Sequence, residues 1–391
     1  MQYFTPLQTS SARARNQNKN TPIYYYFTII SNLYTTNMKI DVQHHMIPQA
    51  YVDKMASIGI TETLGVPFPK WSPDDSLQFM NKNGIEVAIL SISCPGVCFR
   101  DETFSEDLAR LCNEVMADTK KSHPGRFGGF AAIPLEYPDA SLRELKFALD
   151  ELHLDGVGLF AQYNGKYLGD ETFDPVFAEL NRRKAVVYIH PSEPGPANDP
   201  KLGMPSALIE APFETTRAVA NMMYQGTLDK YPDIRFVLAH GGGTIPFLAW
   251  RMSLIQYAQK DKKAPILRSL YDFLIQGAPQ TGLDSIRKMY VDTALVSGSS
   301  ALSALKEFPG PSKIVFGSDF PFAKVAPIVA KNLSKDGDFS EQELEAISHG
   351  NCHELFPQFA TTPEPKEEED NSWGLDTLYS TLHGFIFGKP E

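Results

Sequence analysis

The sequence has few cysteines and no long hydrophobic run, and each shortage excludes a class of protein. Four cysteines in 391 residues are too few for a disulfide framework and suit a reducing compartment. Cys94 and Cys98 stand close together, but no second pair follows at zinc-ligand spacing, so we interpret both as plain thiols. A membrane-spanning helix needs about 18 consecutive apolar residues, and no such run is present. We therefore expect a soluble, cytoplasmic protein.

The chain is also short of positive charge. Its 36 basic residues are outnumbered by 47 acidic ones, which gives a net charge of -11. That sign opposes binding to a phosphate backbone or an anionic lipid surface, so we expect no nucleic-acid or membrane partner. A hydrophobic content of 42% at this length is enough for one large buried core. The composition therefore favours a single enzyme-sized domain with tails.

Both ends of the chain differ in composition from the middle. Residues 1–37 contain no acidic side chain, the first being Asp41, and resemble a transit peptide in composition. The aromatic stretch 24–27 makes a poor amphipathic helix, so we interpret 1–37 as a dispensable extension, with a targeting signal as the alternative. Residues 361–391 include the acidic run 367–370 and are expected to form a solvated acidic tail.

The middle of the chain alternates short apolar runs with longer, more polar stretches. Such alternation is typical of βαβ units, and continuously apolar runs are typical of parallel strands covered on both faces. Eight units of this kind close naturally into a barrel, so we predict an α/β fold, a (β/α)₈ TIM-type barrel over residues 38–360. The predicted strands are 38–44, 87–93, 127–135, 156–160, 185–190, 235–240, 289–294 and 313–318.

Four metal-competent side chains stand where predicted strands end. His45 follows the first strand, His190 and His240 end the fifth and sixth, and Asp319 follows the eighth. The carboxyl ends of barrel strands meet at one mouth, where barrel enzymes build their active sites. Imidazole and carboxylate groups together are ligands of Zn²⁺-like ions. The sequence therefore predicts a divalent-metal site at this mouth.

Around these residues the chain resembles a known family. The motifs match, in order along residues 38–357, those of the amidohydrolase-related (amidohydrolase 2) decarboxylases in the metal-dependent hydrolase superfamily. That family includes aminocarboxymuconate-semialdehyde decarboxylase, γ-resorcylate decarboxylase and the fungal 6-methylsalicylate decarboxylases of secondary metabolism, and the resemblance is greatest to the last. The matching segments are 40–45, 189–191, 238–243, 316–321 and 350–351.

The resemblance implies roles for the strand-end residues. It implies that His45, His190 and Asp319 hold one divalent metal, Zn²⁺ in the first place and Mn²⁺ as the alternative. It implies that His240 is catalytic and that Asp319 shares the handling of the proton. The implied reaction is the non-oxidative release of CO₂ from an aromatic or unsaturated carboxylic acid, such as a 6-methylsalicylate-like hydroxybenzoate. A homodimer or higher homo-oligomer is implied as well.

One position departs from the family pattern. The family carries His-x-His or Glu-x-His after the first strand, whereas this chain has Gln43 before His45. Successive strand residues point to opposite faces, so Gln43 and His45 share a side and His44 faces away unless the strand bulges. Three hypotheses follow: Gln43 or water completes the metal shell, a bulge brings in His44, or the site is impaired.

Other features leave alternatives open. Arg251 follows His240 on the next helix and is predicted to pair with a substrate carboxylate, with a structural salt bridge as the alternative. The glycines 241–243 lack the lysine of a phosphate loop and are interpreted as letting the backbone pass close to the site. The same metal could serve hydrolysis of an ester, lactone or amide, and an impaired homologue could have a binding role instead.

Overall fold

The computed structural model describes residues 38–195, 200, 202–255, 280–323 and 326–360. The predicted extension 1–37 and acidic tail 361–391 lie outside the described residues, so these domain limits stay predictions. In the part of the chain that is described, no helix has both the length and the apolar character needed to cross a membrane.

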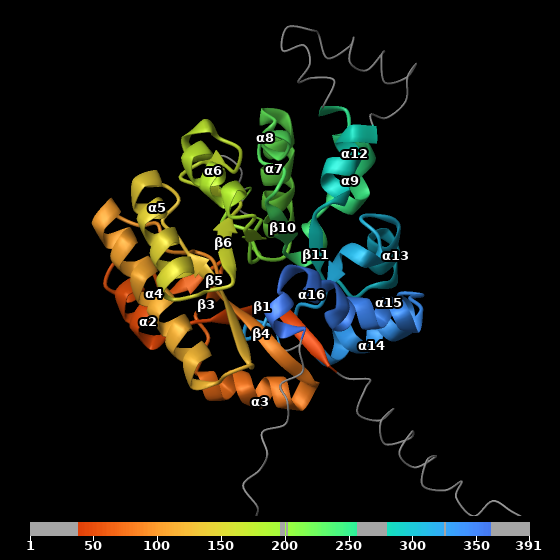
Figure 1. The fold of residues 1–391 in the computed structure, drawn as a ribbon, viewed down its shortest axis with the longest axis horizontal. Helices are drawn as coiled ribbons and strands as arrows, with labels where there is room; N and C mark the ends of the chain where they lie inside the picture. Colours follow the sequence, from red (N-terminus) through yellow and green to blue (C-terminus); the bar gives the residue numbers. More distant parts are fainter. Residues whose placement is uncertain (1–37, 196–199, 201, 256–279, 324–325, 361–391) are drawn as a thin grey trace, which may run out of the picture.

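Eight parallel strands form one sheet that closes on itself (Figure 1). The backbone N–H of Val42 donates to the Phe316 carbonyl at 2.9 Å and that of His45 to the Phe320 carbonyl at 2.7 Å, joining the first strand to the end of the last. Each strand overlaps a predicted run, so the (β/α)₈ barrel is confirmed. In sheet order the strands are β1 Lys39–Met46, β4 Ile85–Ile92, β5 Phe127–Ala132, β6 Gly156–Phe160, β9 Val186–His190, β10 Arg235–Leu238, β11 Tyr290–Asp292 and β12 Ile314–Val315.

Helices between the strands cover the outside of the barrel (Figure 1). Local signals set their ends: Ser72 caps one helix start through the Asp75 N–H, and Gly84 ends that helix with a φ of 65°. The larger helices are α2 Gln49–Ala56, α3 Pro73–Asn83, α4 Glu102–Ser122, α5 Pro138–Lys146, α6 Asp174–Arg182, α7 Glu210–Gln225, α9 Ile245–Met252, α12 Gln280–Arg287, α13 Ser299–Glu307 and α14 Ala326–Asp336; the shorter ones are α8 Thr227–Lys230, α15 Glu341–Glu345 and α16 Asn351–Leu355.

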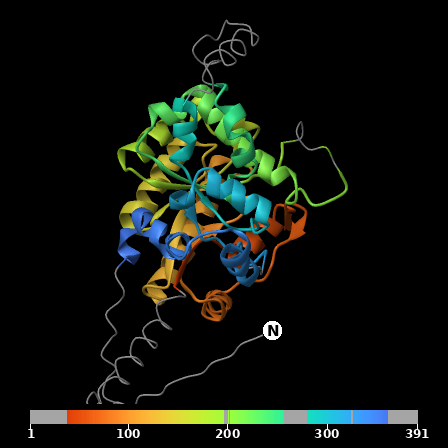
Figure 2. The same cartoon turned by 90° about the vertical axis from the view of Figure 1, so that its right-hand side faces the viewer.

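Two small hairpins and a long loop stand at the mouth. The hairpins are β2 Glu62–Thr63 with β3 Val66–Pro67, and β7 Gln162–Tyr163 with β8 Lys166–Tyr167. Figure 2 shows the loop after β9 extending outward beside the β2–β3 region, and a cavity of about 510 Å³ lies between the two. These loops form part of the wall around the carboxyl ends of the strands.

The barrel interior is apolar toward the amino ends of the strands. Phe130 and Tyr188 stack there with ring centroids 5.1 Å apart, and Leu355 and Phe356 close that end. Asn351 holds this plug in place by donating to the Ile314 carbonyl at 2.7 Å. Because apolar side chains fill the amino-terminal end of the barrel, the polar groups of the predicted metal site lie at the carboxyl ends of the strands.

The four cysteines are free. Burial raises the pKa of both Cys94 and Cys98 to about 12. A thiol that stays protonated at neutral pH is a poor nucleophile and a poor metal ligand, which agrees with their interpretation as plain thiols.

Candidate metal centre

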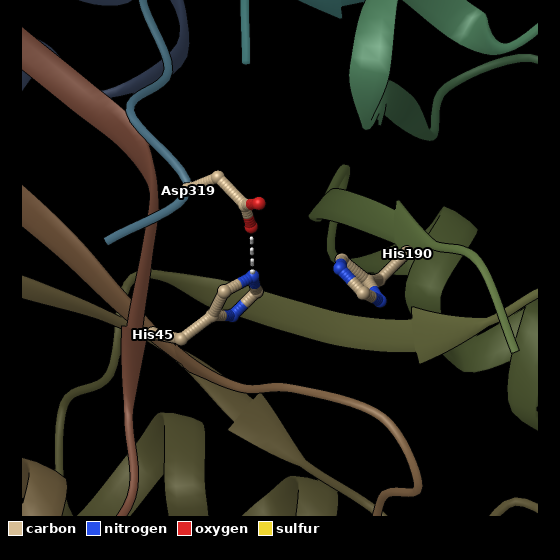
Figure 3. A group of neighbouring side chains, drawn as sticks. All are labelled: His45, His190 and Asp319. Carbon is tan, nitrogen blue, oxygen red and sulfur yellow. Dashed lines mark ion pairs between the residues drawn. The ribbon is translucent and has the colours of Figure 1, made fainter. Parts of the chain in front are cut away.

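His45 on β1, His190 on β9 and Asp319 on the loop after β12 converge. One ligand atom of each lies within 4.8 Å of the others, and all three residues are buried. His45 Nε2 stands 3.2 Å from Asp319 Oδ1, and the His45 and His190 rings meet edge to face at 4.8 Å. Figure 3 shows the carboxylate directed at the His45 ring and the His190 ring facing both from across the barrel mouth. Two imidazoles and a carboxylate at this spacing suit a divalent ion.

Neighbouring groups orient both imidazoles toward the centre. His190 Nδ1 lies 2.9 Å from the Pro191 carbonyl, which can only accept, so Nδ1 carries the proton and Nε2 keeps its lone pair. Burial, with the charges of His45 and His240, holds the pKa of His190 well below its usual value. His45 Nδ1 contacts the Ser91 hydroxyl at 2.9 Å. Outer partners of this kind fix a metal-binding imidazole in a productive orientation.

Asp319 is held by its backbone. Its φ is 61°, a left-handed conformation that is uncommon outside glycine. Its N–H donates to the Gln43 carbonyl at 2.9 Å. The preceding Ser318 donates its N–H to Asp41 at 2.9 Å and its hydroxyl to the same carboxylate at 2.5 Å. A buried acid on β1 therefore fixes the turn that directs Asp319 toward the histidines.

His44 belongs to that supporting network and not to the metal cluster. Its Nδ1 lies 3.0 Å from Asp41 Oδ2 and its Nε2 lies 2.9 Å from the Ser76 hydroxyl on α3. The pairing of β1 with β4 does shift register between Asp41 and His44, so the bulge exists. It nevertheless leaves His44 facing outward, stacked on Phe320 at 4.7 Å. The hypothesis that a bulge makes His44 a ligand is therefore wrong.

Gln43 lies inside the site, on the same side as His45. Its Nε2 donates to Asp319 Oδ1 at 2.9 Å and stands 3.1 Å from His240 Nε2 and 3.5 Å from His45 Nε2. Its Oε1 is buried, and within the described ranges it has no hydrogen-bond partner. A buried carbonyl oxygen without a partner costs about 1–3 kcal/mol. The Nε2 end of the amide faces the cluster in this conformation, and a half-turn of the amide would direct Oε1 there instead. A cation among these side chains would then satisfy that oxygen, so the residues present fit a metal.

His240 stands beside the three ligands. Its φ is 54°, and its backbone N–H donates to Asp292 at 2.9 Å. Its Nδ1 lies 3.1 Å from the Ala294 carbonyl, so Nδ1 carries the proton and Nε2 faces the site. The ring centroid is 5.7 Å from that of His190. The imidazole is therefore placed to exchange a proton at Nε2 with a bound molecule.

The glycines after His240 let the backbone approach α7 closely. A side chain at Gly243 would collide with the Pro212 carbonyl on α7, and all three glycines have positive φ. Their interpretation as a close-approach segment is thus supported. Arg251 is exposed on α9 and lies outside the metal cluster, so its carboxylate-binding role stays a prediction.

Two cavities flank the cluster at the mouth. One of about 740 Å³ has His240 in its wall and is lined mainly by apolar side chains, among them Pro212, Leu295 and Leu305. The other, about 400 Å³, lies between the loops after β4, β5, β6 and β9 and includes Ser192, two residues beyond His190. His240 is therefore the site residue that borders the larger, mainly apolar cavity, and neither cavity is lined by His45, His190 or Asp319.

Sequence reasoning missed the groups that hold the site residues. Asp41, Ser91 and Asp292 are fully or almost fully buried, and none was predicted to matter. A signal was available, because an aspartate inside a continuously apolar strand is rarely buried without a partner. Asp41 and Asp292 are such residues.

Comparison with known proteins agrees with this architecture. Residues 40–358 match the amidohydrolase family model. A decarboxylase of Aspergillus niger, yanB, is 34% identical over 376 residues, covering 89% of this chain and 98% of that protein. The 6-methylsalicylic acid decarboxylase acuB of Aspergillus aculeatus is 34% identical over 335 residues, covering 82% and 96%. The chain therefore belongs to the amidohydrolase family.

Solved structures show the same fold. A dihydroxybenzoic acid decarboxylase from Polaromonas sp., with bound manganese and the inhibitor 2-nitroresorcinol, superposes with a TM-score of 0.69 at 22% identity, covering 83% of this chain and 98% of that one. That identity supports the fold alone. The predicted family is confirmed, and the names of the two fungal relatives support the prediction of a carboxy-lyase.

Proposed function

We propose that the protein is a metal-dependent decarboxylase that releases CO₂ from a hydroxybenzoate-like aromatic acid. The observation that carries the proposal is the convergence of His45, His190 and Asp319, with His240 beside them, at the barrel mouth. The decarboxylase names of relatives that match nearly their full length support it. A 6-methylsalicylate-like acid is the substrate we propose first.

His45, His190 and Asp319 would hold one divalent ion, with the Gln43 amide oxygen as the neutral fourth ligand. When bound, such an ion supplies a Lewis-acidic positive charge that attracts a carboxylate substrate. Zn²⁺ and Mn²⁺ both accept this mixture of nitrogen and oxygen ligands. The structural neighbour that holds manganese makes Mn²⁺ a candidate beside Zn²⁺.

The chain's own residues supply the proton chemistry. Loss of CO₂ leaves an electron pair on the ring carbon, and a proton must take the place of the carboxylate. His240 Nε2 faces the site while its Nδ1 is held by the Ala294 carbonyl. Nε2 would therefore first take up a proton from the substrate hydroxyl or from solvent and then deliver it to the ring carbon, which leaves the imidazole neutral again with its proton on Nδ1. Asp319, fixed by Gln43, would share in that transfer as well as in ligation.

Further features belong to this proposal as expectations. We propose a cytoplasmic enzyme of secondary metabolism that acts on a small carboxylic acid and assembles as a homodimer or higher homo-oligomer. We propose that residues 38–360 make up the catalytic domain and that Arg251 contacts the substrate carboxylate. Hydrolysis of an ester, lactone or amide, and binding without catalysis, are outcomes of the test below.

The test is metal analysis of the purified protein together with CO₂ release from a panel of hydroxybenzoates, with matching esters, lactones and amides alongside. We expect about one divalent ion per chain and CO₂ from at least one acid, lost on chelation and restored by Zn²⁺ or Mn²⁺. Hydrolysis of the ester panel without CO₂ release would replace the proposal by the hydrolase alternative. A protein that takes up no metal and acts on nothing would indicate the binding role.

A further inference from the structure

Asp292, at the end of β11, is a buried carboxylate without a defined role in the site. It is completely buried, and three donors surround it. Oδ1 accepts the backbone N–H of His240 at 2.9 Å and that of Ala294 at 3.0 Å. Oδ2 accepts the Tyr188 hydroxyl at 3.2 Å. The carboxylate therefore joins β9, the turn after β10 and the turn after β11.

Keeping an acid at this place is costly. Burial raises the pKa of Asp292 to about 7, and no lysine or arginine in the described ranges pairs with it. An apolar side chain would fill the same space without the desolvation penalty of a buried acid. The three hydrogen bonds must offset that penalty, so the groups that donate them indicate which part of the structure the carboxylate positions.

Two of these hydrogen bonds fix the backbone at His240 itself and at Ala294, the residue whose carbonyl accepts from the His240 ring. His240 has a left-handed φ of 54°, which is a strained conformation for a residue other than glycine. Its N–H is fixed by Asp292 Oδ1, and its Nδ1 is held by the carbonyl of Ala294, whose own N–H is fixed by the same oxygen. One carboxylate oxygen thus sets the backbone on either side of the imidazole.

We infer that Asp292 is the positioning residue of His240, which holds the imidazole so that Nε2 faces the metal cluster. This inference rests on the proposed function, because it gives His240 the proton transfer. Within the described residues, Asp292 makes no hydrogen bond to the three metal ligands, and it acts on His240 through the backbone N–H groups of His240 and Ala294. The contribution should therefore lie in turnover and not in metal binding.

The test compares Asp292→Ala with Asp292→Asn in full-length protein of measured metal content. Asp292→Ala removes the acceptor, and we expect kcat to fall by about 100-fold, since a displacement of about 1 Å can cost that much. KM and metal content should stay within about 3-fold of wild type. Asp292→Asn keeps an oxygen for both N–H groups, so it should restore kcat to within about 10-fold of wild type.

Asn113→Ala is the matched control. Asn113 is also buried and also holds backbone, accepting from the Ala132 N–H and donating to its carbonyl, each at 2.8 Å, but it lies away from His240. Its loss should lower stability while kcat per folded molecule stays within about 2-fold of wild type. An equal loss of kcat in Asn113→Ala and Asp292→Ala would overturn the inference, as would metal loss in Asp292→Ala.

A crystal structure of Asp292→Ala separates this inference from the proposed function. In Asp292→Ala we expect His240 Nε2 to move by about 1 Å or more from its place beside Gln43. In Asp292→Asn we expect it to keep its wild-type position. If wild-type protein releases no CO₂ from any acid, the proposed function fails and these structures alone decide the positioning role. If His240 does not move, or kcat is unchanged in Asp292→Ala, the inference fails and the proposed function stands.

Discussion

Gln43 places a neutral amide at the position where the resemblance to the decarboxylase family implies an imidazole or a carboxylate. Its side chain lies against Asp319 and His240 through Nε2, and its Oε1 has no partner in the described residues, so a half-turn of the amide would offer that oxygen as a weak fourth ligand. An imidazole is the stronger donor to Zn²⁺-like ions, so Gln43→His should raise metal affinity by about 10-fold or more. Competition with a chromophoric chelator measures this, with Gln43→Asn as the control that keeps an amide but shortens its reach. Unchanged affinity in Gln43→His would show that this position does not contact the metal.

His44 supports the site from behind, so its removal should affect stability and not metal content. His44→Ala removes hydrogen bonds to Asp41 and Ser76 and leaves a cavity, which should cost about 2–3 kcal/mol of unfolding free energy. Urea unfolding measures that cost, and metal analysis of the folded variant should still give the wild-type ratio. His45→Ala is the paired variant that should lose the metal. A folded but metal-free His44→Ala protein would restore His44 as a ligand.

Among the helices, α6 carries an ion-pair cluster whose strength should depend on pH. Hydrogen bonds from Arg182, and then from Arg183, lower the pKa of Glu179 to about 2. A depressed pKa stabilises the fold above the unfolded value of about 4.3, and that stability is lost as pH falls toward 2. Because the Arg182 side chain is 66% exposed, solvent screening limits the contribution to about 1 kcal/mol.

Glu179→Gln should therefore be less stable than wild type at pH 7 by about that amount, and the gap should narrow as pH falls below about 4. Urea unfolding at pH 7, 5, 4 and 3.5 measures the gap directly. A difference between the two proteins that stays constant over this range would show that the cluster acts through packing and not through charge.

The barrel strands were predictable because buried parallel strands leave continuous apolar runs in the sequence, and a strand end is visible where such a run meets a polar residue. The alternation of side chains along β1 also placed Gln43 correctly beside His45. The paths of the longer loops were not predictable. Arg251 lies on α9, whose rotation about its axis depends on packing against neighbouring helices, so sequence spacing could not show which way its side chain points.

Asp292 illustrates a second limit. Its importance comes from hydrogen bonds to residues 52 positions away in the chain and on neighbouring strands. A sequence shows that an acid stands in an apolar strand, but only the closed barrel brings it against the backbone of His240. Residues that act on a site through another residue's backbone are therefore harder to find than the ligands themselves.

At the scale of the whole molecule, the first barrel strand begins at Lys39 and already makes the closing hydrogen bonds with the end of the last strand. Both of these closing hydrogen bonds are made by residues that follow Met38. A protein beginning at Met38 should therefore unfold within about 2 °C of the full chain, which corresponds to roughly 1–1.5 kcal/mol for a domain of this size. Thermal unfolding of both proteins at equal metal content tests this. A markedly lower midpoint would make residues 1–37 part of the fold.

We propose that metal binding and proton transfer are divided between different histidines at one barrel mouth. The most direct test measures metal content and CO₂ release together for wild type, His190→Ala and His240→Ala. We predict that His190→Ala loses both metal and activity, because it removes a ligand, whereas His240→Ala keeps its metal while CO₂ release falls by about 100-fold or more. Metal loss in His240→Ala, or CO₂ release by metal-free His190→Ala, would contradict this division of roles between the two histidines.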